Sequence, residues 1–245
     1  MNGPVATGVR RLDELLAGGL PSGRFALVFG PPFIGKETLA SQFFADGWAR
    51  GEPAILVLTN RAASDVRAAM GARLGPAYGR YEEQGLVHYV DAYSRAIGAD
   101  ADDARVVTYV DSLMDLSALS AAVDQIQARL IRQHPTHRLV FDSVSTLAAY
   151  TNPQTTFRFL QVFLGRARRA GATGMVLLDE GMHSESDVRM YRHLVDGVIE
   201  VREDQGKHVL HVDGLGVREN HGWVEYRFGD HQIEITGSFS AGRIR

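Results

Sequence analysis

The chain contains no cysteine, which excludes a disulfide framework and a thiolate metal site. No stretch approaches ~18 consecutive apolar residues, so the sequence predicts no membrane-spanning helix. The first residues, Met1 to Gly8, do not show the basic region and apolar run of a secretory signal. We therefore expect a soluble, cytoplasmic protein that has no membrane partner.

Lysine is nearly as scarce as cysteine. It occurs only at Lys36 and Lys207, so 24 of the 26 basic residues are arginine, and the formal net charge is −3. A protein dedicated to nucleic acid usually carries a basic surface, and the acidic segment 98–105 does not supply a basic loop. Nucleic acid is therefore not an expected partner.

One of the two lysines lies in a glycine-rich segment with the pattern of a phosphate-binding loop, G-x-x-x-x-G-K-[ST]. The match departs at its last position, where Glu37 replaces the Ser or Thr that normally holds Mg²⁺. A buried strand pattern at 24–30 precedes the loop and a helical pattern at 36–50 follows it, which is the context that such a loop requires. The predicted nucleotide-binding residues are Gly30, Pro31, Pro32, Phe33, Ile34, Gly35, Lys36, Glu37 and Thr38.

Strand and helix patterns alternate through most of the chain. Apolar runs predict strands at 53–58, 86–90, 138–141 and 173–178, and helical patterns lie at 62–74, 116–133 and 156–170, with an irregular loop at 94–106. After Asp196 the pattern changes to short strands at 197–201, 208–212, 223–228 and 232–235. We predict a single α/β domain, 1–245, in which a mostly parallel sheet flanked by helices ends in an antiparallel strand extension.

Two carboxylates are candidate magnesium ligands. Asp142 ends the strand pattern 138–142, where an acidic side chain can reach Mg²⁺ through its waters; the alternative is a helix cap or turn former. Glu37 has three interpretations: a direct Mg²⁺ ligand, a group that pairs with Lys36 or repels phosphate, or a first-turn carboxylate favoured by the helix dipole. Thr38 does not simply replace the missing hydroxyl, because one helical residue turns the side chain by ~100°.

Several segments together resemble the KaiC-type domain of the RecA superfamily. They are T-G through L-P at 7–21, the phosphate loop, F-D-S-V-S at 141–145 and D-G-V-I at 196–199. The segments 156–160 and 178–183 are similar to an archaeal-type branch of KaiC-like ATPases. The resemblance implies a RecA-like P-loop NTPase core, ATP and Mg²⁺ as ligands, and a homo-oligomer, either a ring or a dimer, with ATP between subunits.

The chain departs from the resembled family at its catalytic positions. Active relatives carry two glutamates after the second strand, and the matching residues here are Asn60 and Arg61, neither of which accepts a proton at neutral pH. The late-strand cation of the family is also missing, with Lys207 or Arg218 as replacements. Because a positioned general base is worth about 10²–10⁴ in rate, we expect weak or absent hydrolysis.

The leading hypothesis is a KaiC-like module that binds ATP or ADP and uses binding for regulation, signalling or assembly, with a protein partner as a further expectation. The first alternative is an active ATPase that uses Glu37 and Glu180 in unusual roles, with Glu180 as the replacement catalytic base. The second is a RecA-type accessory protein of DNA recombination, which the net charge disfavours.

Overall fold

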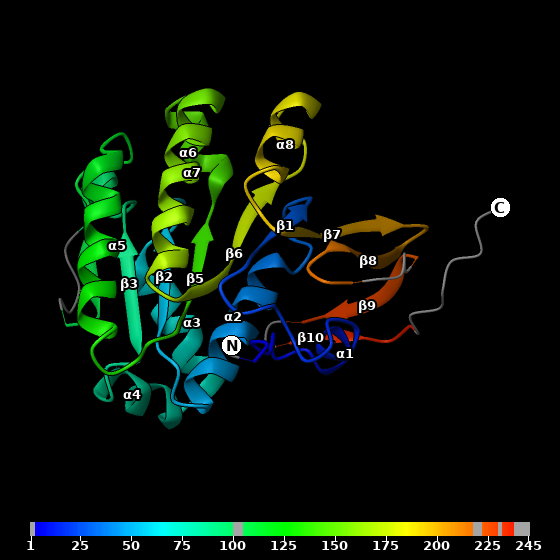
Figure 1. Cartoon of the computed structure of the whole chain (residues 1–245), viewed down its shortest axis with the longest axis horizontal. Coiled ribbons are helices and arrows are strands. Elements are labelled where there is room, and N and C mark those ends of the chain that lie inside the picture. Colours follow the sequence, from blue (N-terminus) through cyan, green and yellow to red (C-terminus); the bar gives the residue numbers. More distant parts are fainter. Residues whose placement is uncertain (1–2, 100–104, 218–221, 230–231, 238–245) are drawn as a thin grey trace.

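The computed structural model describes residues 3–99, 105–217, 222–229 and 232–237. Its centre is one ten-stranded sheet with the order β10-β9-β8-β7-β1-β6-β5-β2-β3-β4 (Figure 1). The seven strands from β7 to β4 run parallel, and β8, β9 and β10 pair antiparallel beyond β7. The predicted fold class, a mostly parallel sheet with a C-terminal antiparallel extension, is confirmed.

The strands are short and mostly buried. Their bounds are β1 Phe25–Gly30, β2 Ala54–Leu58, β3 Val87–Asp91, β4 Val107–Tyr109, β5 His137–Asp142, β6 Ala172–Asp179, β7 Gly197–Asp204, β8 Lys207–Gly214, β9 Val224–Phe228 and β10 Ile233–Ile235. Every residue of β1, β2 and β5 is buried. This is the pattern expected of parallel strands that are covered on both faces, and it explains why the apolar runs of the sequence located them.

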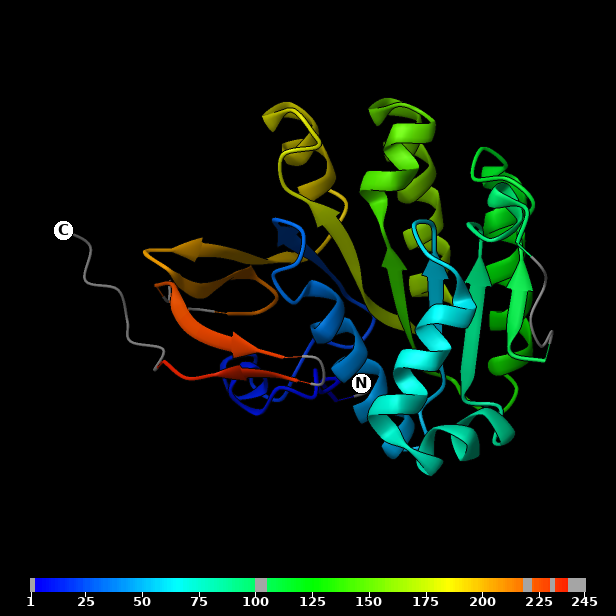
Figure 2. The ribbon, with the colours of Figure 1, turned by 180° about the vertical axis from the view of Figure 1, so that it is seen from behind.

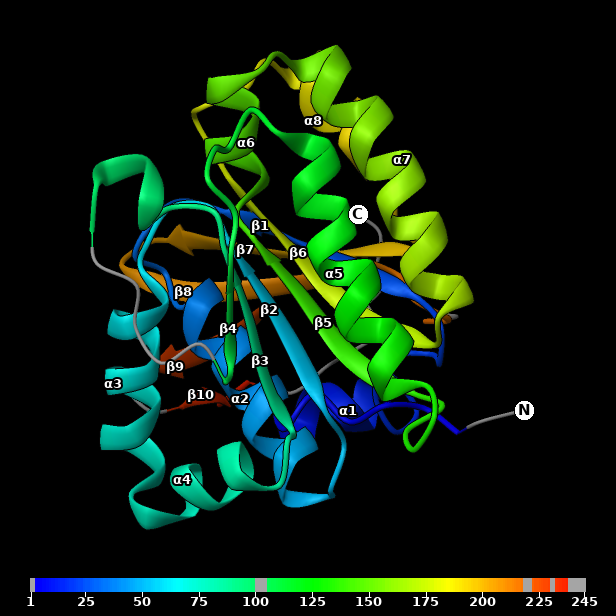
Figure 3. The same cartoon turned by 90° about the vertical axis from the view of Figure 1, so that its left-hand side faces the viewer.

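Helices cover both faces of the sheet, as Figure 3 shows. Their bounds are α1 Arg10–Leu15, α2 Lys36–Ala49, α3 Ala63–Leu74, α4 Pro76–Glu83, α5 Leu116–Leu130, α6 Val144–Tyr150, α7 Pro153–Arg169 and α8 Glu185–Arg192, with a 3₁₀ turn at Arg95–Ile97. Side chains of α1 to α4 form one apolar core against the sheet, and those of α5 to α8 form the other. From behind, α2 and α3 lie in front of the strands (Figure 2).

The sequence patterns miss four short elements. Helices α4, α6 and α8 have only seven or eight residues, and β4 has three. Such segments are too short for a helical period to show, and capping side chains define two of the helices instead: Ser143 for α6 and Ser184 for α8. Of the segment expected to be an irregular loop, residues 100–104 lie outside the described residues, as does Arg218.

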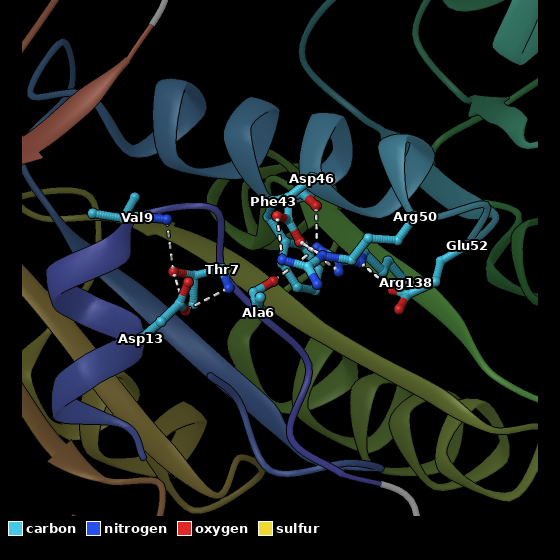
Figure 4. A network of polar contacts seen from close by, with 9 residues as sticks. All are labelled: Ala6, Thr7, Val9, Asp13, Phe43, Asp46, Arg50, Glu52 and Arg138. Atoms are coloured by element: carbon cyan, nitrogen blue, oxygen red, sulfur yellow. Dashed lines mark hydrogen bonds and ion pairs between the residues drawn. The ribbon is translucent and has the colours of Figure 1, made fainter. Parts of the chain in front are cut away.

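A buried arginine joins α2 to β5 at the amino end of the strands (Figure 4). Arg138 is 1% exposed, and its Nε and Nη2 lie 2.7 and 3.0 Å from carboxylate oxygens of Glu52 and Asp46. Its Nη1 donates to the carbonyl oxygens of Ala6, at 2.8 Å, and Phe43. The helix that follows the phosphate loop is therefore tied to the strand that ends in Asp142.

No helix among the described residues is long and apolar enough to span a membrane.

Candidate functional site

The phosphate-loop residues connect β1 to α2 at the carboxyl edge of the sheet (Figure 1). Phe33 and Gly35 have positive φ angles of 59° and 94°, and Gly35 is the N-cap residue of α2. No side chain caps this helix terminus. The first-turn amide groups of α2 are therefore available to an anion, and the dipole of the helix adds positive potential at the same place.

Lys36 lies buried inside this loop. Its ammonium group donates to the carbonyl oxygens of Gly30, at 2.9 Å, and Pro31, and it forms an ion pair with Asp179 Oδ1 at 2.9 Å. A lysine has three N–H donors, so these three oxygen atoms satisfy it. Its partner is thus Asp179, not Glu37 as one interpretation of the sequence holds.

Asp142 lies at the end of β5 and is 1% exposed. Arg61 Nη2 donates to its Oδ2 at 2.6 Å, and Asn60 Nδ2 lies 3.3 Å from its Oδ1. Burial raises the pKa of Asp142 and the negative charge of Glu37 adds to this effect, while Arg61 and Asn60 oppose it. Asn60 and Arg61, which stand where the resembled family has two glutamates, therefore both contact the Asp142 carboxylate.

Hydrogen bonds between neighbouring strands hold Arg61 at that position. Strands β2 and β5 pair in parallel with Leu58 opposite Asp142. Beyond this pair, Thr59 Oγ1 donates to the carbonyl oxygen of Ser143 at 2.9 Å and accepts from the Ser143 amide at 2.8 Å. The chain that leaves β2 is thereby fixed beside the end of β5, and the next two residues reach the Asp142 carboxylate.

Asp179 connects Lys36 to a second polar group. Its backbone amide donates to Ser145 Oγ at 2.8 Å, and His183 Nε2 lies 2.9 Å from the same oxygen. Burial lowers the pKa of His183, which favours the neutral imidazole at pH 7. Sequence reasoning missed the role of Asp179, although it ends a buried apolar strand in the same way as Asp142.

Other predicted site residues lie around the loop without contacting Lys36. Glu180 is exposed, and its backbone amide donates to the Gly30 carbonyl oxygen at 2.9 Å. The side chain of Phe33 is 91% exposed at the tip of the loop. Thr38 Oγ1 lies 3.4 Å from the carbonyl oxygen of Gly229, so it faces the antiparallel extension.

The antiparallel extension packs against the phosphate loop. Tyr226 Oη donates to the carbonyl oxygen of Ile34 at 2.7 Å. The ring of Phe228 covers Gly35, where an added Cβ would lie 2.8 Å from Phe228 Cγ. Glycine is therefore required at position 35 for two reasons: the positive φ angle and the close approach of the Phe228 ring.

The carboxylates do not form an ordinary magnesium site in this arrangement. Both oxygens of Asp142 contact Asn60 or Arg61, and Glu37 replaces the hydroxyl ligand of the loop. Among residues 3–99, 105–217, 222–229 and 232–237, no three His, Asp or Glu side chains form a group that could hold a metal ion. A magnesium ion at Asp142 would have to displace a guanidinium that is already bound.

Sequence comparisons place the chain among KaiC-type ATPases and UPF0273 proteins. A family model described as ATPase: KaiC matches residues 5–235. A UPF0273 protein of Thermotoga maritima is 32% identical over 244 residues, covering 95% of this chain and 92% of the relative. A UPF0273 protein of Pyrococcus furiosus is 30% identical over 205 residues, covering 82% and 78%.

A solved structure has the same fold. The KaiC-like protein of Pyrococcus horikoshii OT3 superposes with a TM-score of 0.73 at 21% identity, covering 95% of this chain and 98% of that one. Membership of an ATPase family implies a nucleotide at the phosphate loop, with Mg²⁺ in the ordinary form of the site. On the match of the family model and the identity to these relatives, the chain belongs to the KaiC ATPase family.

Proposed function

We propose that the chain binds an adenine nucleotide at residues 30–38 and acts as a nucleotide-dependent regulatory or assembly module with little or no hydrolysis. The observation that carries this proposal is the ion pair between Arg61 and Asp142 at 2.6 Å. A guanidinium stands at a sequence position where active relatives carry a glutamate, and it has hydrogen-bond donors but no acceptor.

The phosphate-binding half of the site supports nucleotide binding. The first turn of α2 has no side-chain cap, and Lys36 lies buried at the base of the loop beside Gly30 and Pro31. Backbone amides and one ammonium group are what a polyphosphate requires, and neither depends on the catalytic residues. A chain that keeps the phosphate-binding groups but lacks the catalytic glutamates is therefore expected to bind a nucleotide without hydrolysing it.

A second candidate function is a slow ATPase that uses Glu180 as base. The hydrogen bond from the Glu180 amide to the Gly30 carbonyl oxygen favours it, because this bond holds residue 180 beside the loop. Its exposed side chain argues for low efficiency, since an exposed carboxylate is hydrated by bulk water and is not held in a water-excluded site.

Binding and turnover measured on the same protein test the proposal. We expect calorimetry to detect binding of ATP or ADP, Lys36→Ala to abolish it, and steady-state hydrolysis to stay at background in both proteins. Turnover well above background that is lost in Lys36→Ala would contradict the proposal. Turnover that Glu180→Gln also removes would establish the second candidate instead.

A further inference from the structure

The partner of Asp142 bears on which form of nucleotide the site accepts. We propose that Arg61 takes the place of Mg²⁺ in neutralising Asp142, so that the site binds a nucleoside di- or triphosphate without a metal ion. This inference rests on the proposed nucleotide binding. It differs from the ordinary phosphate-loop site, where Mg²⁺ bridges the β- and γ-phosphates.

The first observation is that Asp142 is already neutralised. Its carboxylate is 2% exposed, and Arg61 Nη2 lies 2.6 Å from Oδ2. The amide of Asn60 approaches the other oxygen at 3.3 Å. A divalent cation would have to displace a charge-assisted hydrogen bond in a buried position, where an ion that loses its partner is costly.

The second observation is that the contact with Asp142 does not use all the donors of the guanidinium. The Arg61 side chain is 35% exposed, although its carboxylate partner is almost fully buried. Its Nε is buried and has no hydrogen-bond partner among the described residues. A guanidinium has five N–H donors in a planar fork, a geometry that suits phosphate oxygens as well as carboxylates.

The third observation concerns the ligand that the loop lacks. Glu37 stands where a hydroxyl would bind Mg²⁺, and its negative charge acts on Asp142, whose pKa it helps to raise. The positive charge of Arg61 therefore lies beside the Asp142 carboxylate, on which the negative charge of Glu37 also acts. A monovalent guanidinium that is fixed to the chain supplies the local neutralisation for which other sites recruit a metal ion.

The test compares nucleotide affinity in excess Mg²⁺ and in excess EDTA, with ADP and ATP as probes in calorimetry. We expect the dissociation constant of the unmodified chain to agree within about threefold between the two buffers. A larger gain in Mg²⁺ would overturn the inference and leave nucleotide binding intact. Absence of binding in both buffers would refute the proposed function and, with it, this inference.

Variants test whether Arg61 is the source of the proposed metal independence. We expect Arg61→Gln to lose about tenfold or more in affinity in EDTA and to regain most of it in Mg²⁺, because Asp142 becomes available to the ion. Arg61→Lys keeps the charge and should keep binding in EDTA, which serves as the measurement if Arg61→Gln does not fold. Unchanged affinity of Arg61→Gln in EDTA would overturn the inference.

The matched control is Arg67→Gln. Arg67 lies in α3 and pairs with Glu82 at 2.9 Å, so this variant removes an arginine from an ion pair in which neither residue is a predicted site residue. We expect its affinity in EDTA to stay unchanged. An equal loss in the control would assign the effect of Arg61→Gln to general charge or stability and would overturn the inference.

Discussion

Lys36 and Arg61 each bind a carboxylate of the chain itself. Lys36 pairs with Asp179 at 2.9 Å and Arg61 with Asp142 at 2.6 Å. Both cations lie at the carboxyl edge of the sheet, beside the proposed nucleotide site. At the scale of single residues, each cation is therefore already paired with a carboxylate of the chain. The phosphates of a nucleotide would have to compete with Asp179 and Asp142 for these two cations.

Asp179→Asn tests this competition. The variant removes the negative charge that is paired with Lys36, so we expect the affinity for ATP to rise by about tenfold, which corresponds to ~1.4 kcal/mol. Glu185→Gln, which removes an exposed carboxylate from α8 that pairs with Arg189, is the control and should have little effect. A weaker affinity of Asp179→Asn would show instead that Asp179 orients Lys36 for the phosphate. Titration calorimetry distinguishes these results.

At the scale of elements, the loop is held from two sides. The Arg138 contacts fix α2 to β5 at the amino end of the strands (Figure 4), and Tyr226 in β9 fixes the loop at Ile34. Helix α2 is therefore joined by polar contacts to strand β5, and the phosphate loop is joined to the antiparallel extension. A change in the loop on binding would be transmitted to these elements first.

Gly47→Ala tests the contact between α2 and β5. Alanine normally stabilises a helix by about 1 kcal/mol over glycine. At Gly47, however, an added Cβ would lie 2.5 Å from Arg138 Nε and 2.6 Å from its Cδ. We expect a loss of about 2 kcal/mol in the free energy of unfolding, because a buried arginine with several partners must move.

Gly165 provides the matched control for this substitution. It lies in α7, where an added Cβ would meet nothing within 4 Å. Gly165→Ala should therefore raise the free energy of unfolding by ~0.5–1 kcal/mol. Denaturant titration of both variants measures whether the free energy of unfolding falls or rises. A stabilised Gly47→Ala would mean that Arg138 can shift without loss of stability.

At the scale of the whole molecule, exposed apolar side chains lie at the edge that carries the proposed nucleotide site. Phe33 follows β1 and Met182 follows β6, with 91% and 57% of their surfaces exposed. The two strands are neighbours, with Gly30 opposite Asp179. Large apolar side chains in adjacent loops are typical of a surface that another chain covers.

Nucleotide-dependent assembly is the corresponding prediction. We expect sedimentation to show a larger species in the presence of ATP or ADP, and the double variant Phe33→Ser, Met182→Ser to remain at its smaller size. Val162→Ser removes an apolar side chain of 54% exposure from α7, away from this edge, and should assemble like the unmodified chain. A size that does not respond to nucleotide would contradict an assembly role and would leave binding itself unaffected.

The sequence alone determined every strand of the sheet except β4, the glycine-rich connection from β1 to α2 and the acidic end of β5. Continuous apolar runs locate strands that are buried on both faces. A glycine-rich loop with a lysine between a strand and a helix is typical of a phosphate-binding loop. That positions 60 and 61 hold an amide and a guanidinium in place of carboxylates was also readable, because this chemistry does not depend on the fold.

Only the tertiary structure decided which charges meet. Lys36 and Asp179 are 143 positions apart, and Arg61 and Asp142 are 81 apart. The parallel pairings of β1 with β6 and of β2 with β5 bring the ends of these strands to one edge. Ion pairs depend on distances of a few ångströms, which sheet register fixes and local sequence does not encode.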